Sequence, residues 1–515
     1  MRTVLFLAAF SSTLALAQRP DEADMFGGSD EPTLDAGTIE EPVDAGTSRD
    51  LQQLEGVAIT SKFDLGEILS DTLKIGGNLL INGQGYFQQS RPFIEGSFSA
   101  PMLLDLYIDG RPNDRIRAYA QGRLQFDPTR PTGGAASSTA TAGSGSVGLT
   151  SQTGANPQVL LDQLWLRFDI ARAVYVTVGR QKVRWGVSRI WYPTDFLNSR
   201  PRDALNPFDL RLGVNMLKLH VPIESLGWNF YGYGLLEGIN IGSSGMQLQN
   251  LGGALRGEFV VGPAEFSVSG VWQQGKRQRY AADLSTGLGP IDIYAEVAFR
   301  DGRDFVTFDR PDDLNQSNLV ENAVLGNITA RRRSGVVVQA SGGVSYSFNY
   351  TDKNTMILAA EYFFNPAGYD KPIDYLLQAF APQFSPEALD PIQQVALYQG
   401  KHNLGLIVSL PGLPGADWVT VNLTNIFIIN DPAAMSRLDV VFRVLNYLTV
   451  QAFGAVFYGE AGGQLRFWLS NKLVTDLAAL SEATNPGTGL QTRQGLAPLR
   501  AAPLVQAGIL LRVSI

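Results

Sequence analysis

The sequence contains no cysteine and only two histidines, His220 and His402. The absence of cysteine excludes a disulfide scaffold and any haem or iron–sulfur centre that needs thiolate ligands. With only these two imidazoles available, we expect no histidine metal site. We therefore expect neither a metal nor a cofactor, and we expect no nucleic-acid partner.

Charge and long apolar runs are also scarce. Charged residues make up 17% of the chain, against roughly 25% in an average soluble domain. No segment approaches the ~18 consecutive apolar residues that a spanning helix needs; the longest run, 404–410, is interrupted by Gly405 and Ser409. Glycine is abundant, at 54 of 515 residues. This composition suits a β-barrel whose strands face lipid.

The N-terminus has the features of a secretory signal peptide. Arg2 supplies the positive charge, residues 4–10 supply a short apolar core, and residues 15–17 form a small-x-small cleavage site. We expect cleavage after residue 17, so that the mature chain starts at Gln18. No cysteine follows the site, which excludes a lipoprotein anchor.

The acidity of the chain is concentrated near its N-terminus. Residues 1–50 hold ten of the 49 acids and three of the 41 bases, which leaves 39 acids against 38 bases in the remainder. With this composition we expect residues 18–50 to be disordered, and residues 51–70 to form a linker or a short plug-like helix. The predicted domains are thus a periplasmic segment, 18–70, and a barrel, 71–515. The ten acids are Asp21, Glu22, Asp24, Asp30, Glu31, Asp35, Glu40, Glu41, Asp44 and Asp50.

Residues 73–88 show the pattern that decides the fold class. Apolar or small residues alternate with mostly polar ones, which is the period of a β-strand with different surroundings on its two faces. The pattern recurs to the end of the chain, behind a signal peptide, and this predicts a transmembrane barrel with lipid outside and water inside. The apolar face carries Leu73, Ile75, Gly77, Leu79, Ile81, Gly83, Gly85 and Phe87.

The strand at 116–126 shows which face is the lumen. Arg117 and Arg123 share one face with Arg115 just before the strand, and three arginines are too costly against lipid. We expect the strand arginines to pair with acids on neighbouring strands. These arginines are Arg115, Arg117, Arg123, Arg167, Arg256 and Arg300, and the expected acids are Asp105, Asp109, Asp169, Glu258, Glu296 and Glu361.

The predicted fold is all-β: an antiparallel up-and-down barrel of 16–18 strands, with 18 the best single value. We expect long extracellular loops and short periplasmic turns. Helices are predicted in two long loops, over 385–399, where Pro386 would follow a Ser385 N-cap, and over 471–482. The predicted strands are 73–88, 102–109, 116–126, 158–170, 173–184, 212–222, 226–238, 250–261, 264–276, 290–300, 303–309, 334–350, 355–365, 402–410, 417–429, 437–443, 447–459 and 504–515.

Residues 179–211 are the least generic stretch. Valines 174, 176 and 178 share a strand face with Arg180, Lys182 and Arg184, so either a bulge at Gly179 turns the cations inward or the strand has left the lipid there. A proline-rich loop follows, in which cations crowd against Asp195, Asp203 and Asp209.

Residues 179–186 read Gly-Arg-Gln-Lys-Val-Arg-Trp-Gly, and Asn206-Pro207 follows. This stretch resembles a family of porin-like bacterial outer-membrane barrels of mostly unassigned function, marked by a Gly-Arg-Gln-x-x-x-Trp-Gly strand and an Asn-Pro segment. The resemblance covers about residues 179–209. It implies a barrel in the bacterial outer membrane, in contact with lipid and lipopolysaccharide, and says little about the solute.

The loop 187–211 has three interpretations. It could fold into the lumen as a charged constriction, its ion pairs could simply brace it while its aromatics form an interface girdle, or it could face lipopolysaccharide. The candidates for lining the pore or setting its selectivity are Arg115, Arg117, Arg123, Arg167, Arg180, Lys182, Arg184, Arg202, Asp195, Trp185 and Tyr192.

The favoured function is a porin-like channel for diffusion of small hydrophilic solutes, with a weak preference for anions. One alternative is a substrate-specific conduit, for hydrophobic substrates among others, that recruits a periplasmic partner through residues 18–50. A barrel enzyme is the least favoured alternative, because no nucleophile or acid is spaced to act with either histidine, and we expect no enzyme. A homo-oligomer is compatible with the lipid-facing pattern.

Overall fold

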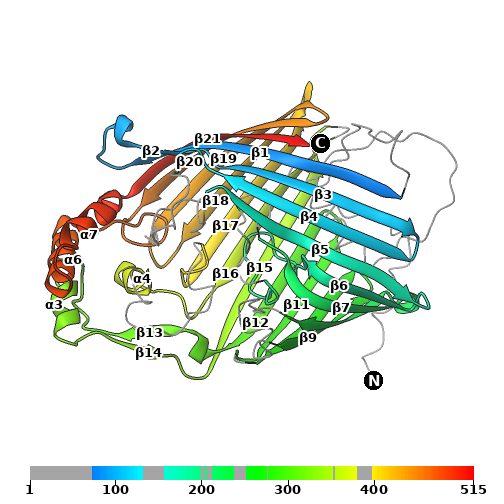
Figure 1. Ribbon diagram of the computed structural model, residues 1–515, viewed down its shortest axis with the longest axis horizontal. Coiled ribbons are helices and arrows are strands. Elements are labelled where there is room, and N and C mark those ends of the chain that lie inside the picture. Colours follow the sequence, from blue (N-terminus) through cyan, green and yellow to red (C-terminus); the bar gives the residue numbers. More distant parts are fainter. Residues whose placement is uncertain are drawn as a thin grey trace, which may run out of the picture.

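The computed structural model describes residues 72–130, 156–198, 202, 205, 211–236, 251–274, 276–351, 354–379 and 397–514. In these residues eighteen antiparallel strands form one closed barrel, each paired with its neighbours along the chain (Figure 1). The barrel closes where β1 pairs with β21, from Asn78 opposite Ser514 to Gln88 opposite Pro503. The strands are β1 (Leu73–Gln88), β3 (Met102–Asn113), β4 (Ile116–Phe126), β5 (Gln158–Ile170), β6 (Val174–Gln181), β7 (Val214–Ile223), β8 (Trp228–Leu235), β9 (Gly252–Val261), β10 (Ala264–Gln273), β11 (Arg279–Leu288), β12 (Ile291–Asp301), β15 (Val336–Asn349), β16 (Thr355–Phe364), β17 (His402–Leu413), β18 (Ala416–Ile428), β19 (Ala433–Leu445), β20 (Leu448–Gly459) and β21 (Pro503–Ser514).

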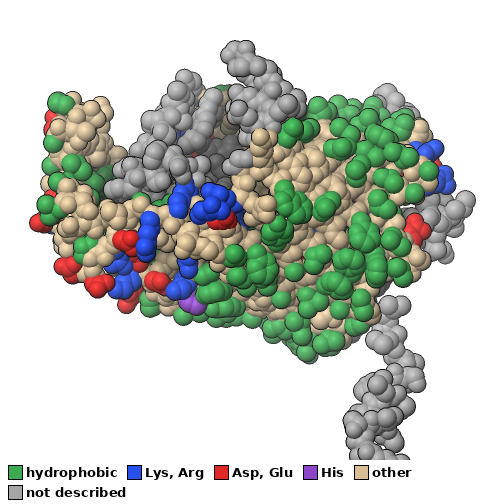
Figure 2. Space-filling model, turned by 90° about the horizontal axis from the view of Figure 1, so that it is seen from below, with side chains coloured by type: hydrophobic (Ala, Val, Ile, Leu, Met, Phe, Trp, Pro, Cys, Tyr) green, Lys and Arg blue, Asp and Glu red, His purple; other side chains and the backbone are tan. Residues whose placement is uncertain are grey.

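The two faces of the wall differ as the alternation predicts. Outward residues are apolar and exposed on the isolated barrel, such as Leu106 and Ile509, whereas inward residues such as Gln84 and Asn403 are polar and almost fully buried. Figure 2 shows apolar side chains over much of the outer wall and charged side chains gathered toward its ends. An apolar exterior around a polar interior matches a barrel that stands in lipid.

The two ends of the barrel differ in the length of their connections. At the turn end, β3–β4, β9–β10 and β17–β18 are joined by two residues each, and β1 begins here, because Leu73 pairs with Gly110. At the long-loop end, the connections carry α3 (Leu319–Val324), α4 (Pro372–Ala379), α6 (Asn471–Thr484), α7 (Gly489–Leu496) and the hairpin of β13 (Val306–Asp309) and β14 (Thr329–Arg332). Figure 1 shows α3, α6 and α7 together at this end.

The helix predicted over 471–482 is confirmed as α6, whose first turn is capped by the Ser470 hydroxyl accepting from the Leu473 N–H at 3.2 Å. The helix predicted over 385–399 falls mostly outside the described residues. Within the described part of the chain, no helix combines the length and apolarity needed to span a membrane.

The predicted count of eighteen strands is confirmed, but one assigned strand is wrong. Residues 303–309 contribute only β13, which pairs with β14 outside the barrel, while β11 was missed. The outward face of β11 mixes Tyr280 and Leu284 with Ala282 and Thr286, so its contrast with the inward face is weak. A further short strand, β2 (Ser97–Ser99), pairs only with β1.

The main hydrophobic core lies inside the barrel toward the long-loop end. Inward side chains of the wall, such as Phe363 and Ile426, pack there against loop residues such as Trp191, Tyr398 and Phe467. Loops therefore fill part of the lumen, and the loop after β6, which carries Trp191, is one of them.

Candidate constriction site

The loop after β6 crosses the lumen. It leaves the wall at Gln181, and its residues 186–194 contact β12, β15 and β16, which lie six to eight strands further round the barrel. The loop is thus bonded both to the wall it leaves and to a distant wall. Two buried carboxylates make most of the bonds to the distant wall.

Glu296, on β12, is fully buried and accepts hydrogen bonds from one part of the loop. The backbone N–H groups of Val187 and Ser188 donate to Glu296 Oε1 at 2.7 and 2.6 Å, and the Thr194 hydroxyl donates to Oε2 at 2.6 Å. A carboxylate with several short donors is well stabilised even without a cation.

Glu361, on β16, continues the same pattern one step along the loop. It accepts from the backbone N–H groups of Arg189 and Trp191, both at 2.8 Å, and of Ile190 at 3.2 Å. The Tyr294 hydroxyl donates to Glu361 at 3.0 Å. Five consecutive N–H groups, from Val187 to Trp191, therefore end on two wall carboxylates.

The predicted role of these two acids is thus wrong. Glu296 and Glu361 were expected to pair with strand arginines, yet the groups that bind them are backbone N–H and hydroxyl donors of the loop and wall. Strand periodicity identifies an inward carboxylate but not which loop reaches it. Arg300, one expected cation, donates instead to the Pro193 carbonyl at 3.3 Å.

Two glycines allow the close approach of the loop to the distant wall. Gly186 has φ +102°, and a Cβ there would lie 2.5 Å from Glu296 Oε1. On β17, a Cβ at Gly405 would lie 2.2 Å from Ile190 Cδ1 and 3.2 Å from the Trp191 ring. A side chain at Gly186 would also be strained by the positive φ and would displace the Glu296 carboxylate, and one at Gly405 would displace the Ile190 side chain.

Trp191 is the apolar anchor of the loop. It is fully buried and stacks on Phe363 with ring centroids 5.7 Å apart. Its indole N–H donates to the Leu397 carbonyl at 2.8 Å, and the N–H of the next residue, Tyr192, donates to the Tyr398 hydroxyl at 3.1 Å. The loop is therefore held by packing as well as by hydrogen bonds.

The cations predicted in the wall meet at Asp162. Arg123 donates to Asp105 at 2.8 Å and contacts Asp162 at 2.9 Å, and Lys182 contacts Asp162 at 2.8 Å. Gln121 pairs with Gln163 and the next residue of β4 with Leu161, so Asp162 is the extra residue of a bulge. Lys182 thus points inward, in agreement with the interpretation that the cations after Gly179 turn into the lumen.

The bulge that one of the two interpretations placed at Gly179 is absent, and β6 ends two residues later, at Gln181. The β5–β6 pairing runs without a register shift through Gly179, and the bulge lies at Asp162 on the neighbouring strand. Gly179 instead has φ +127°, and a Cβ there would lie 2.2 Å from the Leu164 carbonyl oxygen. Arg180 follows beside Gly213.

Three further candidates line the wall toward the turn end. Arg117 pairs with Asp109 at 2.9 Å, and Arg115 pairs with Asp169 at 2.9 Å. Arg167 lies over the Tyr175 ring at 5.1 Å. The predicted pairings of Arg115, Arg117 and Arg123 with strand acids match these contacts, as does that of Arg256 with Glu258 at 2.8 Å.

The remaining candidates lie within the loop. Arg184 donates to the Tyr192 hydroxyl at 2.8 Å, and Arg202 lies 5.9 Å from the centre of the Tyr192 ring. Asp195 pairs with Arg211 at 2.6 Å; its predicted companions Asp203 and Asp209 lie outside the described residues.

Trp185 and Tyr192 are packing residues in this structure. Trp185 is 1% exposed and meets Tyr233 edge-on, and Tyr192 is 3% exposed. Their rings support the loop, and the neighbouring cations Lys182 and Arg184 are only partly buried. The two histidines lie elsewhere: His220 stacks between Tyr175 and Tyr231, and His402 contacts the Tyr362 hydroxyl.

Sequence reasoning missed Asp162 and misjudged Glu296 and Glu361. All three are carboxylates in the middle of strands, buried to within 2%. Neither Glu296 nor Glu361 has a cation two residues away, but Asp105, which pairs with Arg123, shares this property, so the sequence holds no signal that separates them.

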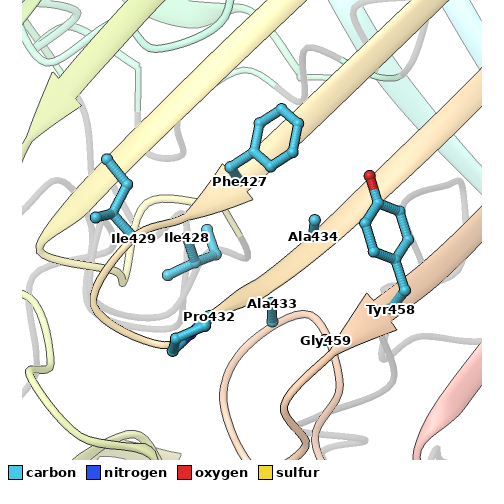
Figure 3. Close-up of a pocket in the computed structure, with 8 residues that line it drawn as sticks. All are labelled: Phe427, Ile428, Ile429, Pro432, Ala433, Ala434, Tyr458 and Gly459. Atoms are coloured by element: carbon cyan, nitrogen blue, oxygen red, sulfur yellow. The ribbon is translucent and has the colours of Figure 1, made fainter.

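A hollow of about 330 Å³ lies away from this site, at the long-loop ends of β18, β19 and β20. Figure 3 shows Ala434 between the larger Phe427 and Tyr458, with Pro432 and Gly459 at the edge. Phe427, Ala434 and Tyr458 occupy outward positions of the wall. The hollow is therefore a notch in the outer face and not part of the lumen.

The loops above the constriction meet at Asp431, between β18 and β19. Its carboxyl is fully buried, accepts from the Tyr369 hydroxyl at 2.9 Å, and leaves Oδ1 without a hydrogen-bond partner among the described residues. The Gln464 N–H donates to the same Tyr369 hydroxyl at 3.2 Å. Burial raises the pKa of Asp431, and the charge of Glu460 raises it further.

We expect the packing of these loops to be strongest in acid. The packed loops hold the Asp431 proton more tightly than released loops would, so this stabilisation is present at low pH and is lost as the pH rises through the raised pKa. Asp431→Asn keeps an acceptor for Tyr369 without the charge, and should remove the pH dependence. Hydrogen–deuterium exchange of residues 366–371 measures it, at pH values from about 4, near the ordinary pKa of an aspartate, upward. Asp370→Asn, at an exposed neighbour, is the control; an unchanged pH dependence in Asp431→Asn would contradict the assignment.

Comparison with known proteins finds similarity only among solved structures. No protein-family model and no curated protein matches the chain. OprB of Pseudomonas putida is 11% identical, with a TM-score of 0.43 over 87% of this chain and 96% of that one. OccAB4 of Acinetobacter baumannii is 7% identical (TM-score 0.44, 86% and 98%), and a triple mutant of the Rhodopseudomonas blastica porin is 10% identical (0.38, 86% and 100%). All three are distant resemblances.

Proposed function

We propose that this protein is a channel of the bacterial outer membrane, through which small hydrophilic solutes diffuse with a preference for anions. The observation that carries the proposal is the loop over residues 186–194, which crosses a polar lumen and is bonded to a distant wall by Glu296 and Glu361. A loop that is fixed to the wall by hydrogen bonds forms a permanent constriction and not a moving gate. The charges beside the constriction then set the selectivity of the channel.

The anion preference rests on which member of each ion pair is exposed. In two ion pairs of the lumen the cation is the more exposed partner: Lys182 is 21% exposed and Asp162 0%, and, toward the turn end, Arg117 is 18% and Asp109 6% exposed. In the loop pair of Arg189 with Asp292 the acid is the more exposed partner, at 16% against 10%. Glu296 and Glu361 are buried under N–H donors. A nearly neutral barrel can thus present mainly positive charge to a passing solute.

Reversal potentials in a planar bilayer under a salt gradient test this proposal. We expect stable ohmic steps with a potential of the sign that anion permeation produces. The pair Lys182→Gln and Arg117→Gln should move the potential toward zero, because the remaining acids are then less compensated. The matched control, Arg303→Gln with Arg331→Gln, removes two exposed cations at the long-loop end and should move it less.

Absence of conductance from a folded barrel would overturn the channel. Cation selectivity in the unmodified protein would leave the channel and overturn the anion preference. The first of these two results, a folded barrel without conductance, would favour a conduit that works only with a partner.

A further inference from the structure

Five cations gather at the turn end on β1, β3, β4, and the turn between β5 and β6. We call them the cationic collar: Lys74, Arg111, Arg115, Arg117 and Arg172. Arg172, Arg115 and Arg111 have 76%, 50% and 45% of their side chains exposed. Elsewhere at this end, Glu224 follows β7 and Asp417 lies at the start of β18, whereas the β9–β10 and β11–β12 turns are uncharged Gly-Pro pairs.

The acids that accompany the collar are largely hidden. Asp109 and Asp169 are 6% and 5% exposed, and Asp114 is the one exposed acid among the partners of the collar. Five cations against three acids leave a local excess of two positive charges. Because Asp109 and Asp169 are nearly buried and their arginines are more exposed, the accessible surface of the collar is more positive than the net charge of +2 suggests.

The chain enters the barrel beside the collar. The Arg111 N–H donates to the Thr72 carbonyl at 2.7 Å, and Thr72 is the last residue before β1. Residues 18–50 hold ten acids against Arg19 and Arg49. The 21 residues from 51 to 71 can span at most about 70 Å, so the acidic segment can reach any point of the turn end.

We propose that residues 18–50 bind the cationic collar of their own barrel. The attraction is electrostatic and acts between many exposed charges, so it weakens as salt shortens the screening length below about 10 Å. The binding itself does not depend on the proposed channel function.

The lack of native cysteine makes a distance measurement in the full chain direct. One spin label is placed in the segment by Thr38→Cys. The second is placed by Pro112→Cys beside the collar or, as the matched position, by Pro263→Cys in the β9–β10 turn of the same end. We expect a population of short distances to residue 112 and none to residue 263.

The triple variant Arg111→Gln, Arg115→Gln and Arg172→Gln should reduce the short-distance population about tenfold, as should about 1 M salt. The control triple, Arg303→Gln, Arg331→Gln and Lys472→Gln, removes three exposed cations at the long-loop end and should leave it unchanged. Circular dichroism verifies that each variant is folded.

Equal distance distributions to residues 112 and 263, or a short-distance population that survives the collar triple, would overturn the proposal. The spectroscopic readout needs no conductance, so a failure of the channel function and a failure of this binding are distinguished.

Discussion

Glu361→Leu should release the constriction loop and raise the single-channel conductance at least about twofold. The substitution leaves the N–H groups of Arg189, Ile190 and Trp191 without their acceptor, and each buried unpaired donor costs about 1–3 kcal/mol. Water can satisfy these donors only if the loop leaves the wall. Conductance in a planar bilayer measures the result, and trypsin cleavage after Arg189 reports the release separately.

The control for this variant is Glu258→Leu, which removes a wall carboxylate bonded to Arg256 and not to the loop. It should leave both the conductance and the cleavage near those of the unmodified protein. Glu361→Gln keeps the shape but turns an amide NH2 toward N–H donors, and should behave like a milder form of Glu361→Leu. Unchanged conductance and cleavage in Glu361→Leu would show that the bonds to Glu296 and the packing of Trp191 hold the loop without Glu361.

Arg123→Leu should destabilise the barrel by about 3–5 kcal/mol, the usual effect of removing one partner of a buried ion pair. Arg123 is 3% exposed and binds two carboxylates, Asp105 and Asp162, that are themselves almost fully buried. Lys182 still compensates Asp162, so the loss falls mainly on Asp105. Urea unfolding in lipid vesicles, followed by tryptophan fluorescence, gives the free energy of unfolding.

Arg115→Leu is the matched control, because it removes an arginine whose side chain is half exposed; its effect should be small, since solvent screens such pairs. Adding Asp105→Leu to Arg123→Leu should recover part of the stability, as the remaining buried charge is removed. A small loss in Arg123→Leu with no recovery in the double variant would show that water enters this part of the wall.

The strands were predictable because alternation is a local property. In β1, β4 and β21 most outward positions are apolar or small and most inward positions are polar, with Leu80 and Leu510 as inward exceptions, so successive residues show the alternation. It failed at β11, where outward alanine and threonine weaken the contrast, and at 303–309, where a short alternating stretch forms a hairpin above the barrel. Alternation alone does not say whether a strand joins the wall.

Part of the candidate site was also predictable. The inward direction of Arg117 and Arg123 followed from the cost of arginine in lipid, and their partners Asp109 and Asp105 lie on the neighbouring strand. The position of Asp162 was not predictable, because a bulge shifts the inward face by one residue and leaves little trace in the pattern.

The sequence by itself determined the class of this protein: a barrel with an apolar exterior, a polar lumen lined by paired arginines, and an acidic segment ahead of the first strand. These properties depend on composition and on residues one or two positions apart. The tertiary structure alone decided what crosses the lumen. The bonds from residues 187–191 to Glu296 and Glu361 join positions more than 100 residues apart, and only closure of the barrel brings those walls within reach of the loop. The exposure of each ion-pair partner is likewise a property of the closed barrel, because curvature decides which side chain stands behind the other.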